Sequence, residues 1–387
     1  MSIDNICADA VAWRHDLHRH PELAFKEERT SGFVAAKLES FGLDVTRGLA
    51  GTGVVGTLRR GASPRAIALR ADMDALAIEE TNTFAHRSTR QGLMHACGHD
   101  GHTAMLLAAA RALALDSQFD GAVHFIFQPA EENEGGGEVM IREGLFERFP
   151  VDAVYGMHNA PWIPQGVFAI RTGPIMAAFD RFWIEIEGVG AHGALPHTGV
   201  DPIPIAAQIV MALQTLVSRR TNPLEAAVVS VTQIHAGDSL NVIPDKVRLA
   251  GGVRTFLPEA QTTIETGVRT IAQNIAAAHG ANAQLKYERG YPATINESRA
   301  VAAALNAARA VVGDANVIAD TSPMMASEDF AFMLRAKRGS YMFIGAGGGA
   351  NTCMVHNPGY DFNDAILPLG VRYWIALVRQ ELAPGSP

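Results

Sequence analysis

The chain has few cysteines, no excess of positive charge and no long apolar run, and each shortage argues against a class of protein. The chain has three cysteines, Cys7, Cys97 and Cys353. They are too few for a disulfide framework, and an odd number cannot all pair within the chain. A net charge of −8 without a basic cluster argues against a nucleic-acid surface. No run approaches the roughly 18 apolar residues of a membrane helix, and the N-terminus lacks the pattern of an export signal. We therefore expect a cytoplasmic protein with neither nucleic acid nor membrane as a partner.

The length of the chain indicates more than one domain. Its 387 residues exceed the roughly 250–300 at which a single core stops growing. An apolar content of 48% and a charged content of 19% are typical of a well-packed globular protein.

The two ends of the chain alternate apolar runs with helical patterns. "RAIALRAD" (65–72) reads as a buried strand, and "HTAMLLAAARALALD" (102–116) has the apolar content of a packed helix. Strands that alternate with such helices are typical of an α/β fold with a mostly parallel sheet. The other expected strands are 121–130, 152–159 and 340–347, and the other expected helices are 298–313 and 367–382.

The middle of the chain has a different pattern. "RFWIEIEGV" (181–189) alternates strictly, with Phe182, Ile184 and Ile186 on one face. Further strands are expected at 226–237, 246–254 and 282–289, and helices at 201–220 and 258–280. The order βαββαβ predicts a ferredoxin-like domain. We expect it to be inserted at 178–290 into an outer domain formed by residues 1–177 and 291–387.

One short stretch concentrates side chains that bind metals. "MHACGHDGHT" (94–103) contains His95, Cys97, His99 and His102 immediately before an expected helix. The stretch is either the polar first turn of that helix or part of a metal site.

Other residues of metal-ligand type lie at the ends of expected strands of the outer domain or just after them. They are Asp72 and Asp74, the adjacent Glu131 and Glu132, His158, and His356. Each alone has an ordinary structural interpretation, such as a buried thiol or a solvated carboxylate. Because ligands of open α/β sheets bind beyond the carboxyl ends of strands, their common placement favours a metal site.

Several motifs together resemble the M20 metallopeptidase family, in particular its hippurate hydrolase and N-acyl-amino-acid amidohydrolase branch. The most specific are "MHACGHDGHT" and "PAEE", with "RADMDAL", "GMHN", "NVIPD" and "HNPGYDFND" in support. The resemblance implies a zinc-peptidase-like catalytic domain with two metal ions and an inserted lid domain that often dimerises.

The resemblance also assigns roles to residues of the outer domain. Glu131 would be the general base and acid, and Asp74 the carboxylate that orients a ligand, with Asp72 a second candidate for that task. The implied metal ligands are Cys97, His99, Glu132, His158 and His356.

In the inserted domain, His192, Asn241 and Arg254 resemble residues that contact the substrate. In related enzymes that histidine reaches the site from the partner subunit. The family more often has Thr at the position of Gly252 and Ala at that of Gly137, and neither difference touches a ligand.

Physical chemistry agrees with this assignment. Five ligands shared by two ions leave coordination positions open, as a catalytic site requires, and a thiolate can bridge two cations. Glu131 must stay off the ions to carry a proton, and Glu132 would point the opposite way in an extended segment. The donors suit zinc or manganese, with cobalt or nickel possible. His95 and His102 are expected to support the strand end and the helix start.

We therefore expect a hydrolase of linear amides that cleaves N-acyl amino acids of the hippurate or N-acetyl type, in the manner of an aminoacylase. An N-acetyldiaminopimelate deacetylase or a dipeptidase on the same scaffold is the alternative within the enzymes. An inactive metal-dependent binding protein and a redox sensor built on Cys97 are alternatives of other classes. A homodimer or higher oligomer through the lid is also expected.

Overall fold

The computed structural model describes residues 2–116, 118–132, 134–348 and 353–385, and it divides into two compact units. The larger unit comprises Met1–Ile175, Thr294–Ser322 and Asp329–Pro387. The smaller unit comprises Met176–Ala293 and Pro323–Glu328.

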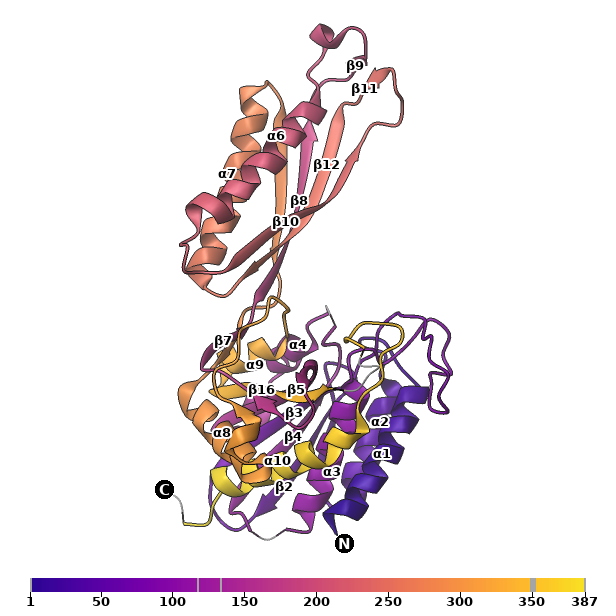
Figure 1. Ribbon diagram of the computed structural model, residues 1–387, viewed down its shortest axis with the longest axis vertical. Coiled ribbons are helices and arrows are strands. Elements are labelled where there is room, and N and C mark those ends of the chain that lie inside the picture. Colours follow the sequence, from indigo (N-terminus) through magenta and orange to yellow (C-terminus); the bar gives the residue numbers. More distant parts are fainter. Residues whose placement is uncertain (1, 117, 133, 349–352, 386–387) are drawn as a thin grey trace. The chain divides into compact units, whose positions relative to one another are not determined.

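The larger unit is built on an eight-stranded mixed sheet in the order β1-β2-β4-β3-β5-β16-β6-β15 (Figure 1). Its central pairs, β4 with β3, β3 with β5 and β5 with β16, are parallel, which confirms the predicted fold class. The strands are β1 (Asp44–Leu49), β2 (Gly53–Arg60), β3 (Ala66–Asp72), β4 (Gly121–Gln128), β5 (Ala153–Pro164), β6 (Phe168–Ala169), β15 (Val317–Ile318) and β16 (Gly339–Gly347). A separate short pair joins β7 (Gly173–Met176) and β14 (Thr294–Asn296).

Helices pack on this sheet because its central strands are apolar on both faces. Every residue of β3, β4 and β16 is buried. Helix α3 is buried along almost its whole length and contacts both α1 and α10 (Figure 1). The helices are α1 (Ile3–Arg19), α2 (Glu28–Ser40), α3 (His99–Ala114), α4 (Gly136–Arg142), α5 (Leu145–Arg148), α8 (Ser298–Val312), α9 (Phe330–Ala336) and α10 (Leu367–Glu381).

Two elements differ from the sequence-based expectation in ways that affect the site. Helix α3 begins at His99, three residues before the expected start, so His99 belongs to its first turn. Strand β5 runs on to Pro164, because β16 continues to pair with it beyond the last residue paired with β3. His158 therefore lies within a strand and not at its carboxyl end.

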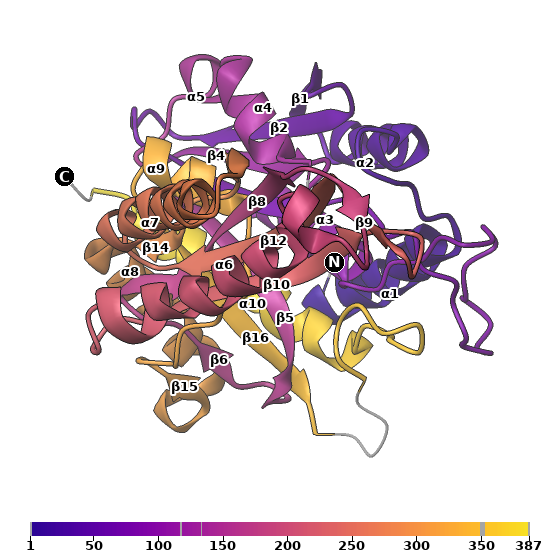
Figure 2. The ribbon, with the colours of Figure 1, turned by 90° about the horizontal axis from the view of Figure 1, so that it is seen from above.

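The smaller unit is a four-stranded antiparallel sheet in the order β10-β12-β8-β13 with two helices. Both helices lie over one face of the sheet, as Figures 1 and 2 show. Phe182, Ile184 and Ile186 point into the core beneath them, as the alternation in the sequence predicts. The elements are β8 (Ala178–Glu187), α6 (Pro202–Thr215), β10 (Ala227–Ala236), β12 (Lys246–Thr255), α7 (Pro258–Ala278) and β13 (Asn282–Arg289). The order βαββαβ is the predicted one.

A small two-stranded pair, β9 (Ala191–His192) with β11 (Val242–Ile243), completes the smaller unit. In the part of the chain that the structure describes, no helix combines the length and apolar content needed to cross a membrane.

Candidate metal centre

Gly98, in the left-handed backbone conformation, places Cys97 at the start of α3. Gly98 has a φ of 99°, and a Cβ atom there would lie 2.3 Å from Asn159 Oδ1 and 2.9 Å from the Tyr360 hydroxyl. Only glycine meets both conditions without strain. The turn brings the Cys97 thiol 3.3 Å from His158 Nε2 on β5.

The five side chains expected to bind metal form two groups that share Cys97. In each group, the potential ligand atoms lie within 4.8 Å of one another. The first group is Cys97, His99 and His158, and the second is Cys97, Glu132 and His356.

Asp74 holds three of the neighbouring groups in place. Its Oδ1 lies 3.2 Å from His99 Nδ1 and accepts the backbone N–H of Glu131 at 3.0 Å. Its Oδ2 accepts the backbone N–H of Glu132 at 2.9 Å. The carboxylate is almost completely buried, so these contacts are shielded from water.

The segment that carries Glu131 and Glu132 follows the end of β4 and is neither helix nor strand. Ala130 has a φ of 56°, and its backbone N–H donates to Glu27 Oε1 at 2.9 Å. Potential ligand atoms of His99, Glu131 and Glu132 lie within 4.8 Å of one another. The expectation that the two glutamates point in opposite directions is therefore wrong, because carboxylate oxygens of the two side chains lie within 4.8 Å of each other.

His356 reaches the group from the segment that follows β16. Its φ is 65°, and its backbone N–H donates to Ala96 O at 2.7 Å, next to Cys97. Its Nε2 lies 3.1 Å from Glu132 Oε1. The His356 side chain is 51% exposed, whereas Cys97, His99 and His158 are buried. One side of the centre is therefore open, as access for a substrate requires.

Behind these residues lies a buried polar network that joins Asp72 and His102 to two residues not expected there, Asn159 and Tyr360. Asp72 accepts from Arg70 Nη1 at 2.7 Å and lies 2.7 Å from His102 Nδ1. His102 Nε2 lies 2.6 Å from Asn159 Oδ1, and Asn159 Nδ2 donates to the Tyr360 hydroxyl at 2.7 Å. The one sequence feature that pointed to Asn159 is its position directly after His158. The network fixes the backbone beside His158.

Burial and nearby charges shift the pKa values of three histidines at the centre in different directions. Burial lowers the pKa of His99, but Asp72, Asp74 and Glu132 outweigh it and raise that pKa to about 10. Burial, with His102 and His99 nearby, holds the pKa of His158 well below its usual range. His95 is buried among the same elements, and burial lowers its pKa to about 4.

The donor set fits divalent cations. The buried His99 Nε2 has no hydrogen-bond partner among the described residues, and Asp72 Oδ2 is 3.9 Å away. A buried ring nitrogen left in this state is costly unless something else binds it. One thiol, three imidazoles and one carboxylate match the ligands of zinc and similar ions.

The structure places the three expected substrate contacts in the smaller unit, in two separate cavities. His192 on β9 and Asn241 before β11 line a cavity of about 510 Å³. There, His192 Nδ1 accepts the backbone N–H of Ala194 at 3.0 Å. Arg254 on β12 lines another cavity, on the face of the sheet that α6 and α7 leave uncovered.

Comparisons with known proteins show the family of the chain. The pattern that defines peptidase family M20/M25/M40 matches residues 68–380. The chain is 40% identical over 369 residues to the hippurate hydrolase of Campylobacter jejuni, covering 95% of each chain. It is 39% identical over 363 residues to the N-acetyl-L-cysteine deacetylase of Bacillus subtilis, covering 92% of this chain and 84% of the relative.

A solved structure shows the same fold. The crystal structure of a dinuclear metal-binding M20 peptidase from Bacillus subtilis superimposes with a TM-score of 0.85 at 34% identity. The match covers 98% of this chain and 99% of that one. The chain belongs to the M20 peptidase family and is a metal-binding hydrolase of the amidohydrolase type.

Proposed function

We propose that the protein hydrolyses the amide bond of N-acyl amino acids with two divalent cations. The observation that carries the proposal is the pair of ligand groups joined at Cys97, with Glu131 beside them. The relatives support the substrate class, since one is a hippurate hydrolase and another an N-acetyl-L-cysteine deacetylase.

In this proposal the five converging side chains hold the ions. Cys97, His99 and His158 would hold one ion, and Cys97, Glu132 and His356 the other. Cys97 is common to both groups, so its thiolate would help to hold both ions. When bound, the ions would activate water and polarise the amide carbonyl. Zinc or manganese suits these donors, and cobalt or nickel is compatible with them.

Glu131 is proposed to move the proton. It would take a proton from the attacking water and pass it to the nitrogen of the leaving amine, as general base and then general acid. Its backbone is anchored on Asp74, which also touches His99. This anchor would keep the Glu131 carboxylate in a fixed position relative to the ligands.

We propose further that residues 1–177 and 291–387 form the catalytic domain and residues 178–290 a lid. Arg254 would hold the substrate carboxylate through charge-assisted hydrogen bonds. His192 and Asn241 would contact the substrate, and the lid would join two copies of the chain. Light scattering on the purified protein tests the homodimer.

The test of the activity is a hydrolysis screen joined to a metal analysis. The protein is loaded with zinc, manganese or cobalt and given N-acetyl, N-benzoyl, dipeptide and N-acetyldiaminopimelate substrates. We expect about two ions per chain and the fastest release of amino acid from N-acyl amino acids. Preference for dipeptides or N-acetyldiaminopimelate would select the corresponding alternative. No turnover on any substrate would favour a metal-dependent binding protein.

A further inference from the structure

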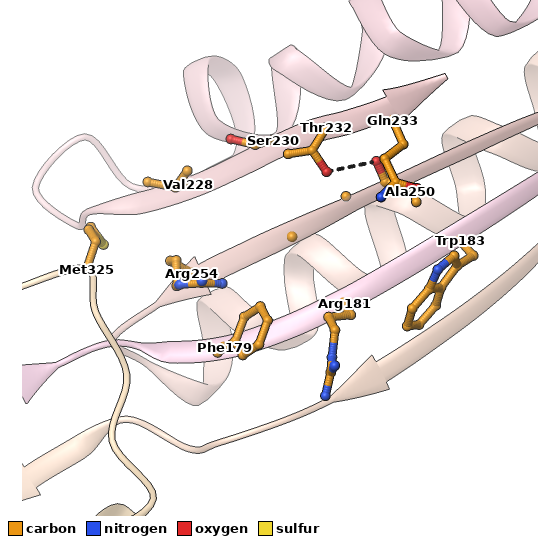
Figure 3. Close-up of a pocket in the computed structure, with 12 residues that line it drawn as sticks. Phe179, Arg181, Trp183, Val228, Ser230, Thr232, Gln233, Ala250, Arg254 and Met325 are labelled. Carbon is orange, nitrogen blue, oxygen red and sulfur yellow. Dashed lines mark hydrogen bonds between the residues drawn. The ribbon is translucent and has the colours of Figure 1, made fainter. Parts of the chain in front are cut away.

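The uncovered face of the smaller unit's sheet carries a trough (Figure 3). Its volume is about 470 Å³, and it is lined by β8, β10, β12 and Met325. The middle strand, β12, presents only small residues at the centre, Ala250 and Gly252. Larger side chains stand on both sides, among them Trp183 on β8 and Val228 on β10 (Figure 3). The floor of the trough is therefore backbone.

The two adjacent glycines of β12 are there for different reasons. A Cβ atom on Gly251 would lie 2.5 Å from the Phe182 ring, so the core requires glycine at that position. A Cβ atom on Gly252 would meet nothing closer than 3.6 Å. Packing does not require glycine at 252, and glycine within a strand is unfavourable. A strand glycine that packing does not explain is typical of a place where a ligand approaches the backbone.

One end of the trough is suited to an anion. The guanidinium of Arg254 lies 3.9 Å from the centre of the Phe179 ring. Its Nη1 donates to the neighbouring Val253 O at 3.2 Å, and the nearby Asp180 carboxylate instead accepts from Gln261 and Tyr287. None of the described residues that line the trough is acidic. Arg254 is therefore a cation fixed in place by an aromatic ring and available to a carboxylate.

The other end of the trough carries the Trp183 ring, with the polar side chains of Thr232 and Gln233 beside it (Figure 3). In the sheet, Phe179 pairs with Arg254 and Trp183 pairs with Ala250, so the two ends are four residues apart. At the rise of a strand this is about 13 Å. The Trp183 side chain is 37% exposed and is flanked outside the trough by Lys286, whose Nζ lies 5.0 Å from the ring. An extended molecule with a carboxylate at one end and a flat group at the other matches this layout.

We propose that this trough binds the acyl group of the substrate and selects flat aromatic acyl groups, with Gly252 as the residue that determines specificity. This inference rests on the proposed function and names its substrate class as N-aroyl amino acids. The carboxylate is held at Arg254, and the acyl ring lies over Gly252 toward Trp183. A small acyl group such as acetyl leaves most of the trough empty and gains little from it.

The test measures binding without hydrolysis. Full-length protein is stripped of metal with a chelator and titrated with N-benzoylglycine or N-acetylglycine, and tryptophan fluorescence is recorded. We expect N-benzoylglycine to bind at least about tenfold more tightly than N-acetylglycine. The fluorescence change should disappear in Trp183→Phe, which separates Trp183 from the other exposed tryptophan, Trp162.

Gly252→Thr fills the floor of the trough and supplies the decisive comparison. Threonine favours strands, and its Cβ would make only ordinary van der Waals contacts, the nearest at 3.6 Å, so the fold should persist, which circular dichroism verifies. We expect a loss of about tenfold in affinity for N-benzoylglycine and a change below about twofold for N-acetylglycine. Gln284→Thr, on the exposed edge strand β13, is the matched control and should change neither.

The outcomes separate this inference from the proposed function. Equal affinities of the two ligands, equal effects of Gly252→Thr on both, or no saturable signal from N-benzoylglycine would overturn the inference. Hydrolysis by the metal-loaded protein is assayed in parallel. Selective binding without hydrolysis would support the inference about the trough and reject the proposed activity. Hydrolysis without selective binding would support the proposed activity and reject the inference about the trough.

Discussion

Asp74 and His99 are joined at 3.2 Å, from carboxylate Oδ1 to ring Nδ1, and the same carboxylate receives the backbone N–H groups of Glu131 and Glu132. A single buried side chain thus sets the position of a proposed ligand and of the whole glutamate pair. Contacts of this kind fix the orientation of a ligand and tune its basicity.

Asp74→Asn should weaken metal binding about 10- to 100-fold. The amide places an N–H donor where one oxygen now accepts, so at least one of the three contacts is lost. Competition with a fluorescent chelator measures the affinity. Asp152→Asn is the control, because the Asp152 carboxylate accepts the Ala66 N–H at 3.1 Å, at the opposite end of β3 from Asp72. Equal affinities in the two variants would show that Asp74 does not position the centre.

Glu131→Gln should keep both ions and lose at least about a thousandfold in kcat, since the amide cannot carry the proton. Metal content by mass spectrometry and turnover of N-benzoylglycine are measured on the same sample. A variant with near-normal turnover would remove Glu131 from the proposed chemistry.

Cys97→Ala should remove both ions, whereas His356→Ala should leave about one, because only Cys97 belongs to both ligand groups. Metal stoichiometry after dialysis gives the answer directly. Cys7→Ser, a buried thiol in α1, serves as the control and should retain two ions. One ion remaining in Cys97→Ala would mean that the thiolate does not bridge.

Gly98→Ala should lower the free energy of unfolding by about 1–3 kcal/mol more than Gly42→Ala does. Both glycines have positive φ, 99° and 82°, so the backbone strain is similar. A Cβ on Gly42 meets nothing within 4 Å, whereas one on Gly98 collides with Asn159. Denaturant unfolding of the two variants isolates the collision. Equal losses would show that the turn relaxes around the extra atom.

His18 should make stability depend on pH in the alkaline range. Burial lowers the pKa of His18, but contacts with Asp100 at 2.8 Å and Glu80 at 3.3 Å outweigh it and raise that pKa to about 9. A raised pKa stabilises the fold fully below the ordinary value of 6.5, and the effect fades as the pH rises through 9.

His18→Gln should therefore remove about 3 kcal/mol of stability near pH 6 and much less above pH 9. Denaturant unfolding across this range measures it, with the exposed His279→Gln as control. A constant difference between wild type and His18→Gln at all pH values would contradict the charged state of His18.

Much of the architecture could be predicted because it follows from the spacing of apolar residues along the chain. The strict alternation around Phe182 and Ile184 could bury only one face of a strand, and the structure buries that face. The outer sheet followed in the same way from apolar runs such as 65–72. The expected site residues of the outer domain do converge, although the roles assigned to them remain predictions.

Local backbone conformations and strand lengths could not be predicted from the amino-acid sequence. Carboxylate oxygens of both glutamates lie within 4.8 Å of a ring nitrogen of His99, and nothing in the sequence around Ala130 predicts its positive φ. The length of β5 depends on how far β16 pairs with it, which is a property of two segments nearly two hundred residues apart.

The fold class, the order of elements and the kinds of donor atom could be predicted from the amino-acid sequence, because they depend on local pattern and on the chemistry of each residue. The folded chain was needed to see which donors share a neighbour, that Asp74 contacts three groups at once, and that Asn159 and Tyr360 lie behind the centre. Distances of a few ångströms between remote segments are set by packing and register, which no single segment encodes.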